Sequence, residues 1–164
     1  MMVYKTKFGE IEINDKDILE FDTGLPGFED LRKFAVVSQG TEPIMWLVSL
    51  EDENIALPVI DPWIVRVDYD VKIPKEVVES LKLEKEEDVQ VWSVLVIPKD
   101  NPDGMTINLL APIVVNKKTG KAMQVILDTD EYDIRHNVKE EMERSRKIME
   151  ELQKQQEKQK EAVK

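Results

Sequence analysis

Val89–Leu127 reads VQVWSVLVIPKDNPDGMTINLLAPIVVNKKTGKAMQVIL, three apolar runs separated by turn residues. The first run, Val89–Ile97, is almost wholly apolar and rich in β-branched residues, which is typical of a strand buried on both faces. Met105–Val115 and Ala122–Leu127 are the next two runs. Prolines with Asn-Pro and Asp-Gly pairs mark the first connection, and Asn116–Gly120 has the length of a hairpin loop. The stretch predicts a continuous antiparallel meander that the rest of the chain covers.

Shorter apolar runs in the first 60 residues also predict strands. They are Val3–Lys7, Glu10–Asn14, Lys16–Phe21, Phe34–Ser38, Met45–Leu50 and Ile55–Ile60. Within the body, residues 1–136, only the segment after Pro74 has a helical pattern, because Val77, Val78 and Leu81 share one face. One short helix among many strands predicts an all-β fold, an antiparallel β-barrel-like single domain with a helical lid.

The segment Gly24–Glu29, GLPGFE, is a strong turn signal. Gly27 directly follows a proline, the arrangement of a type II turn in which glycine takes the positive φ. We expect Phe28 to anchor this turn to the core.

Residues 137–164 differ from the body in character, since helix formers dominate and Gly and Pro are absent. The apolar positions keep a heptad-like spacing at Val138, Met142, Met149 and Leu152. Ser145 interrupts that spacing. We expect a charged helix from about Val138 to Gln155 with a frayed end, and we divide the chain into a β domain, 1–136, and a tail, 137–164. The helix either lies loosely on the barrel or binds a partner, and two heptads are too few for a coiled coil that is stable alone.

The net charge of −11 is unevenly distributed. Residues 137–164 hold eight Lys and Arg against seven Asp and Glu, so the body, residues 1–136, holds fifteen against twenty-seven. A body this acidic disfavours direct binding to nucleic acid and favours encounter with a basic protein surface. Solubility is the alternative explanation of these charges.

Several classes of site are excluded or left without a motif. The chain has no cysteine, which excludes disulfides, thiolate metal sites and a cysteine nucleophile. It has one histidine, His136, which excludes any site that needs two imidazoles from this chain. It has no phosphate-binding glycine loop and no G-x-S-x-G element. We also see no secretory signal and no apolar run near the ~20 residues that span a bilayer. We therefore expect a cytoplasmic protein without a membrane partner.

Two sets of residues are candidates for a function. Asp61, Asp68, Asp70 and His136 define one alternative, a metal-binding or enzymatic small β-barrel. Against it, aspartates in turns are usually solvated, and a lone histidine beside Arg135 is expected to be a hydrogen-bonded anchor. Aromatic residues define the other set. We expect Trp46 and Trp92 in the core and Trp63 partly exposed as a protein-interface anchor.

Taken together, several motifs resemble the FliW family of flagellar assembly factors. They occur in the expected order over nearly all of residues 2–136: Gly24–Glu29 after Phe21, Trp46–Asp52, Asp61-Pro62, Glu87–Val89, Thr106–Asn116, Gln124–Leu127 and Arg135-His136. The combination is specific, although no single motif is. The chain departs from the family at Leu57, where an aromatic is common, and in the longer tail after His136.

The resemblance implies a small cytoplasmic β-barrel-like protein, monomeric alone, without catalytic activity, cofactor or metal. FliW-like proteins bind flagellin and the RNA-binding translational regulator CsrA. Flagellin that accumulates before export sequesters the FliW-like protein, and CsrA then represses flagellin translation; export reverses the switch. The acidic body suits a partner with a basic RNA-binding surface.

The polar or exposed members of the family motifs are candidate partner contacts. They are Asp61, Pro62, Trp63, Tyr69, Glu87, Asn108 and Pro112. For Asn108 and Pro112 an equally strong interpretation is bulge and edge structure. A further alternative for the whole chain is a dimeric scaffold held together by the helical tail.

Overall fold

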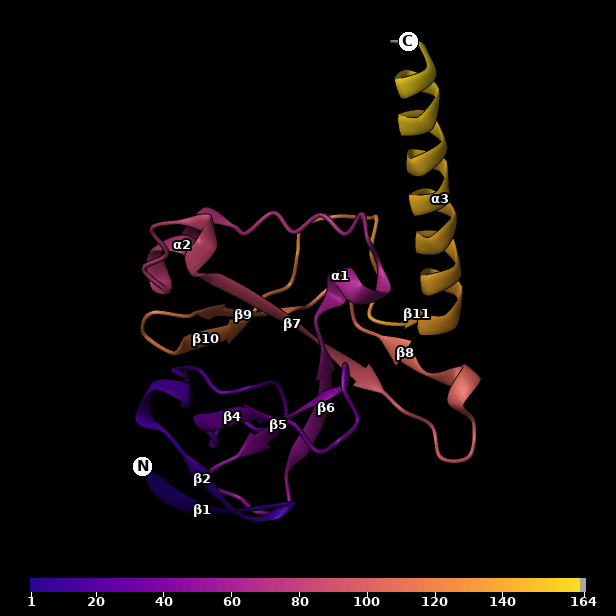
Figure 1. The fold of residues 1–164 in the computed structure, drawn as a ribbon. Coiled ribbons are helices and arrows are strands. Elements are labelled where there is room, and N and C mark those ends of the chain that lie inside the picture. Colours follow the sequence, from indigo (N-terminus) through magenta and orange to yellow (C-terminus); the bar gives the residue numbers. More distant parts are fainter. Residues whose placement is uncertain (163–164) are drawn as a thin grey trace.

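A closed barrel of seven strands forms the body of the computed structural model, which describes residues 1–162 (Figure 1). Around the barrel the strands follow the order β3, β4, β5, β6, β7, β9, β10 and back to β3. Their bounds are β3 Leu19–Phe21, β4 Lys33–Val37, β5 Met45–Ser49, β6 Ala56–Ile60, β7 Val89–Val96, β9 Ile113–Asn116 and β10 Lys121–Gln124. The predicted all-β, barrel-like fold class is confirmed.

Strand β7 is the spine of this barrel. It pairs antiparallel with β6 at Val94, with β9 from Val89 to Trp92, and with the short β8 (Thr106–Ile107) at Leu95. The remaining barrel pairs are antiparallel except for the closure, where β10 runs parallel to β3. The antiparallel expectation is wrong at this one pair, because no local turn joins the two strands.

Two details of the predicted meander are also wrong. The run Met105–Val115 is split between β8 and β9, because Asn108 makes a tight turn: its Oδ1 accepts from the backbone N–H groups of Leu110 (3.1 Å) and Ala111 (2.9 Å). Strand β7 is not buried on both faces along its length, since Gln90 is exposed at one end and Val96 at the other.

Two apolar cores explain the pattern along β7. One cluster draws on all seven barrel strands and fills the barrel; Phe21 and Phe34 meet there edge to face at 5.3 Å, and Trp92 is half-buried against it. The second cluster lies between the barrel and the chain that covers it, and includes Leu95, Tyr69 and Tyr132. The covering segments are α1 (Pro62–Val65), α2 (Lys75–Ser80), the 3₁₀ turn η2 (Glu86–Asp88) and the chain after β10.

Helix α1 was not expected from the sequence, which predicted one short helix where there are two. Its start nevertheless carries ordinary signals: Asp61 Oδ1 accepts from the N–H of Trp63 at 3.0 Å, and Pro62 occupies the first helical position. The helix has only four residues, too few for an apolar period to show.

The two strands predicted at Val3–Lys7 and Glu10–Asn14 are confirmed as β1 (Met2–Thr6) and β2 (Gly9–Ile13). They form an antiparallel hairpin, which is a two-stranded sheet separate from the barrel. Phe8 at its turn packs on Trp46 with ring centroids 5.3 Å apart, so Trp46 is half-buried and not in the core. The start of the predicted strand Lys16–Phe21 is instead the 3₁₀ turn η1 (Asp15–Asp17). Gly27 has the expected positive φ, +85°.

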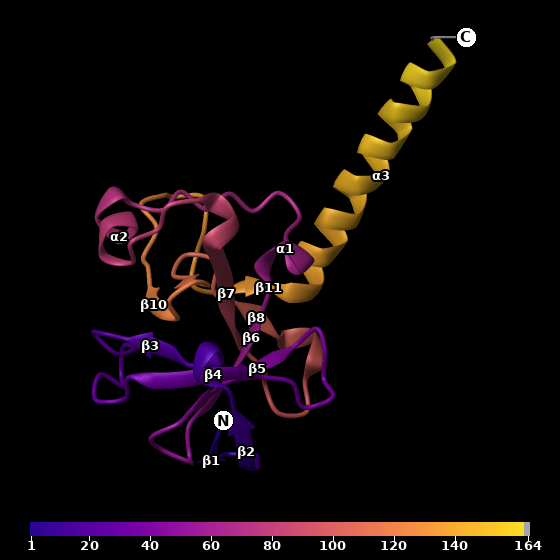
Figure 2. The same ribbon diagram turned by 60° about the vertical axis from the view of Figure 1, so that its left-hand side comes forward.

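The chain ends in a long helix. After the 3₁₀ turn η3 (Pro102–Gly104), β8 pairs with β11 (His136–Asn137), which leads directly into α3 (Val138–Ala162). The predicted end near Gln155 is wrong, since α3 continues to Ala162. Figures 1 and 2 show that α3 touches the body only near its start and then projects away from it. Within residues 1–162 no helix combines the length and the apolar composition that crossing a membrane requires.

Candidate protein-binding surface

An apolar groove of about 510 Å³ opens between strand β7 and the covering segments. We call it the Trp63 groove. Its apolar wall consists of Trp63, Val71, Ile73, Val78, Leu83, Val89 and Val91. Its charged rim is Glu84–Glu86, where η2 begins. An apolar floor with a charged rim is the usual anatomy of a protein-binding site.

Trp63 is the aromatic anchor at one side of this groove. Its side chain is 40% exposed, and its indole Nε1 donates to the backbone oxygen of Tyr69 at 2.8 Å. Tyr69 is buried and its hydroxyl donates to the backbone oxygen of Leu109 at 2.6 Å. Burial raises the pKa of the Tyr69 hydroxyl above its usual range, so it remains a donor at neutral pH. The exposed indole is thus held in a fixed orientation.

A larger hollow of about 710 Å³ lies at one end of the barrel, bordered by β2, β4 and the start of β7. Its border carries polar groups such as Asn14, Lys16, Gln90 and Lys117 among apolar ones. None of the predicted contact residues lines it. The Trp63 groove is therefore the better candidate for a protein partner.

Three residues of α3 hold the chain that carries Trp63. We call Glu141, Arg144 and Ser145 the α3 clasp. Ser145 is buried, 7% exposed; its Oγ donates to the backbone oxygen of Val65 (2.9 Å) and accepts from the N–H of Val67 (3.0 Å). This one hydroxyl therefore pairs with the carbonyl of Val65, the last residue of α1, and with the N–H of Val67 just after the helix.

Arg144 adds a two-pronged ion pair to the same segment. Its Nη1 and Nη2 donate to the two carboxylate oxygens of Asp68 at 2.7 and 2.6 Å. Hydrogen bonding to Arg144 lowers the pKa of Asp68 from 3.8 to about 2. Because both side chains are about 40% exposed, this pair fixes geometry more than it adds stability.

Glu141 links the clasp to His136. Its Oε1 lies 3.1 Å from His136 Nδ1 and 3.6 Å from Arg66 Nη1. His136 Nε2 accepts from the N–H of Asp133 at 2.9 Å, and the Arg66 guanidinium lies 4.8 Å from the centre of the Tyr132 ring. The expected role of His136 as a hydrogen-bonded anchor is confirmed.

The same contacts separate the residues of the proposed metal or catalytic set. Asp61 caps α1, Asp68 pairs with Arg144, Asp70 lies on the surface near Lys72, and His136 faces Glu141. Among residues 1–162 no three His, Asp or Glu side chains gather as a metal site. The geometry gives this alternative no support.

The seven predicted contact residues fall into three groups. Pro62, Tyr69 and Pro112 are buried, so none of these three side chains is exposed to a partner in this structure. Asp61 and Asn108 are half-buried and their carboxylate and amide oxygens accept backbone N–H groups, which supports the structural interpretation of Asn108. Trp63 and Glu87 are exposed and so remain candidate contacts for a partner. Trp63 lines the groove, and exposed Glu87 adjoins its rim, where it pairs with Lys85 at 3.9 Å.

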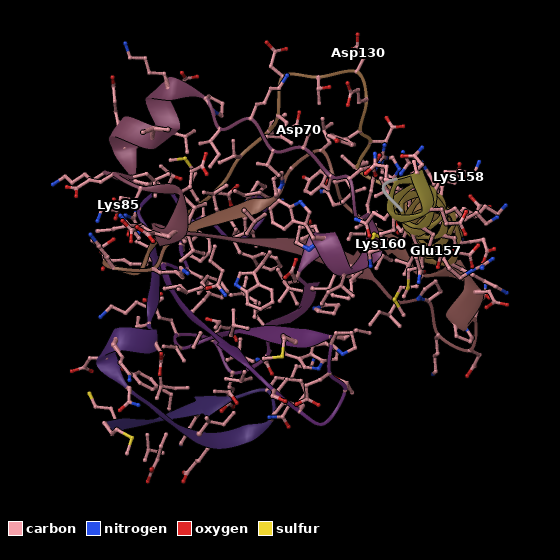
Figure 3. The ribbon with its side chains drawn as sticks, turned by 45° about the horizontal axis from the view of Figure 1, so that its top comes forward. Asp70, Lys85, Asp130, Glu157, Lys158 and Lys160 are labelled. Atoms are coloured by element: carbon pink, nitrogen blue, oxygen red, sulfur yellow. The ribbon has the colours of Figure 1, made fainter. Side chains whose placement is uncertain are left out.

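Sequence reasoning missed the clasp and the apolar wall of the groove. Ser145 offered a signal, because a small polar residue in an apolar stripe marks a position that meets a backbone. Figure 3 shows that Lys85, on the groove rim, lies on the opposite side of the molecule from Lys158 and Lys160 of α3. The contacts between α3 and the Trp63 segment come from the clasp residues, near the start of the helix.

Comparison with known proteins gives consistent results. A family model described as "FliW protein" matches residues 2–138. The flagellar assembly factor FliW of Thermosipho africanus is 53% identical over 140 residues, which is 85% of this chain and 97% of that protein. Its counterpart in Thermotoga maritima is 51% identical over 149 residues, 90% of this chain and all of that protein. A crystal structure of the flagellar assembly factor FliW matches with a TM-score of 0.77 at 32% identity, covering 84% of this chain and 96% of the other.

Proposed function

Because the chain belongs to the FliW family of flagellar assembly factors, we propose that it acts by binding flagellin and the translational regulator CsrA in alternation. Binding to CsrA relieves repression of flagellin translation, and binding to flagellin withdraws the protein from CsrA. The protein works in the cytoplasm through occupancy by one partner or the other, without catalysing a reaction.

The observation that carries this proposal is the Trp63 groove on an acidic body. An exposed tryptophan held by a hydrogen bond contributes a large contact area at little entropic cost, as interface anchors do. The rim residues Glu84 and Glu86 and the neighbouring Glu87 present negative charge to a partner. A basic protein with apolar side chains suits both features, and CsrA, which binds RNA, is such a protein.

Binding to the two partners tests the function. Purified protein is mixed with flagellin and with CsrA at micromolar concentration and low salt, and complexes are detected by calorimetry and size-exclusion chromatography. We expect a complex with each partner, and we expect added flagellin to displace CsrA. Absence of any complex with either partner would falsify the proposal.

A pair of variants tests the surface. Trp63→Ala removes the aromatic anchor, and we expect it to weaken binding of at least one partner by about 30-fold or more, the effect of losing an interface hot spot. Ile126→Ala is the matched control, because Ile126 is 75% exposed and does not line the groove. Equal affinities for both variants would place the interface elsewhere.

A further inference from the structure

Side-chain hydrogen bonds tie the end of α1 and the chain after it to other segments. Ser145 takes the backbone groups of Val65 and Val67, Tyr132 Oη accepts from the N–H of Asp70 at 2.9 Å, and Tyr69 Oη reaches Leu109. Residues 61–70 form no strand pairing. Their position, and with it that of Trp63, therefore depends on these side-chain contacts together with the burial of Val65 and Tyr69 in the core.

We propose that the α3 clasp positions Trp63, so that the first turns of helix α3 control partner affinity at the Trp63 groove without touching the partner. Ser145 is the central positioning residue, because its hydroxyl ties Val65 and Val67, two and four residues after Trp63. Arg144 holds the following residue, Asp68. This inference rests on the proposed function, since it concerns the same groove.

The clasp lies just beyond the end of the family model. The match to that model ends at residue 138, where α3 begins, and every member of the clasp follows that residue. The match to the Thermotoga maritima relative covers 90% of this chain and therefore includes the clasp. The clasp thus brings a segment beyond the family model into contact with the chain that carries the exposed tryptophan. Loss of a clasp contact frees the end of α1, and Trp63 then samples orientations that do not fit a partner.

Ser145→Ala in the full-length chain is the principal test. Alanine leaves the carbonyl of Val65 and the N–H of Val67 without the hydroxyl, so hydrogen exchange at Val67 should become at least about tenfold faster. Affinity for CsrA, the basic partner that suits the acidic rim of the groove, should fall about fivefold or more. Exchange in β7 and β9 should stay at the wild-type rate, which shows that the barrel is folded.

Two further variants sharpen this test. Arg144→Gln removes the partly exposed ion pair with Asp68 and should give the same two changes to a smaller extent. Lys147→Ala is the control, because Lys147 is exposed on the same helix and belongs to no clasp contact; it should change neither quantity.

A double-mutant cycle separates positioning from simple destabilisation. If Ser145 acts through Trp63, adding Ser145→Ala to Trp63→Ala should produce no further loss of affinity. Faster exchange at Val67 with unchanged affinity, or full additivity in the cycle, would overturn the inference while the proposed function stands. No binding by the wild-type chain would instead contradict the proposed function.

Discussion

The first three turns of helix α3 and its remaining length are alike in composition but differ in surroundings. Between Val138 and Ile148, Ser145 is buried and Glu141 and Ile148 are half-buried, whereas every residue from Met149 to Ala162 is exposed. Figure 2 shows the second part standing clear of the body. The apolar stripe continues past the docked turns to Met149 and Leu152, which are exposed, so the stripe alone does not show where the helix docks. The polar residue inside the stripe does.

The projecting part remains helical for local reasons. It contains no Gly or Pro and is built from strong helix formers. Arg146, in the last docked turn, pairs with Glu150 at the start of the projecting part, and such a pair is worth about 0.2–0.5 kcal/mol. Continuity with the docked turns spares it the cost of helix nucleation. The docked part should therefore govern the stability of the body, and the projecting part should not.

Deleting the two parts should produce the largest contrast. Removing residues 138–164 takes away the clasp and the packing of Val138 and Ile148, and should lower the free energy of unfolding by about 3–4 kcal/mol. Removing residues 149–164 should change it by less than about 0.5 kcal/mol. Urea unfolding followed by tryptophan fluorescence measures both values. Similar losses from the two deletions would show that the projecting part is docked in solution.

Ser145→Leu tests which feature of the stripe matters. The substitution completes the heptad-like apolar pattern, so a helix acting as a coiled coil should gain stability or dimerise. Because Ser145 is buried against the backbone of Val65 and Val67, we expect instead a loss of about 2–3 kcal/mol from crowding and two unsatisfied backbone groups. Thermal unfolding shows whether the variant gains or loses stability, and its hydrodynamic mass shows whether it dimerises. A stable dimer would support the scaffold alternative.

The same contrast explains how far the sequence could predict the fold. The alternation of apolar and polar residues, together with turn residues, identified most strands, because this pattern depends only on the residues of the strand itself. The parallel closure between β10 and β3 could not be predicted, because it joins residues about a hundred positions apart. Helix α1 is too short to show a period. The family motifs pointed to Trp63 and Glu87, but they also included Pro62, Tyr69 and Pro112, which are buried.

The extent of the candidate site could not be predicted for a related reason. The groove wall combines half-buried apolar residues that, in sequence, look like core. The clasp depends on contacts between residues separated by 76 to 80 positions, such as Asp68 with Arg144 and Val65 with Ser145. Sequence placed Ser145 on the right helix and face, and only its partner segment was unknown.

A smaller effect is expected from the exposed side of the clasp and should depend on pH. The pKa of Asp68 is lowered to about 2, so its stabilising contribution is present above 3.8 and is lost as pH falls towards 2. Asp68→Asn should therefore destabilise the protein at neutral pH, by less than about 1 kcal/mol because the pair is partly exposed and screened. The difference between wild type and variant should close between pH 4 and pH 2 in urea titrations. A difference that does not depend on pH would exclude the carboxylate charge as its cause.

Gln153→Gly, in the projecting part, should have the smallest effect on the stability of the body. Glycine costs a helix interior up to about 1 kcal/mol, so the helix beyond this point should fray and the far-ultraviolet circular dichroism should lose part of its helical signal. Gln153 is exposed and its helix contacts the body only upstream, so the melting temperature of the barrel should not change. The matched change Lys147→Gly lies within the docked turns and should lower both the helical signal and the melting temperature. If Gln153→Gly also lowers the melting temperature of the barrel, the two parts of α3 are one cooperative unit with the body, and the contrast between them fails.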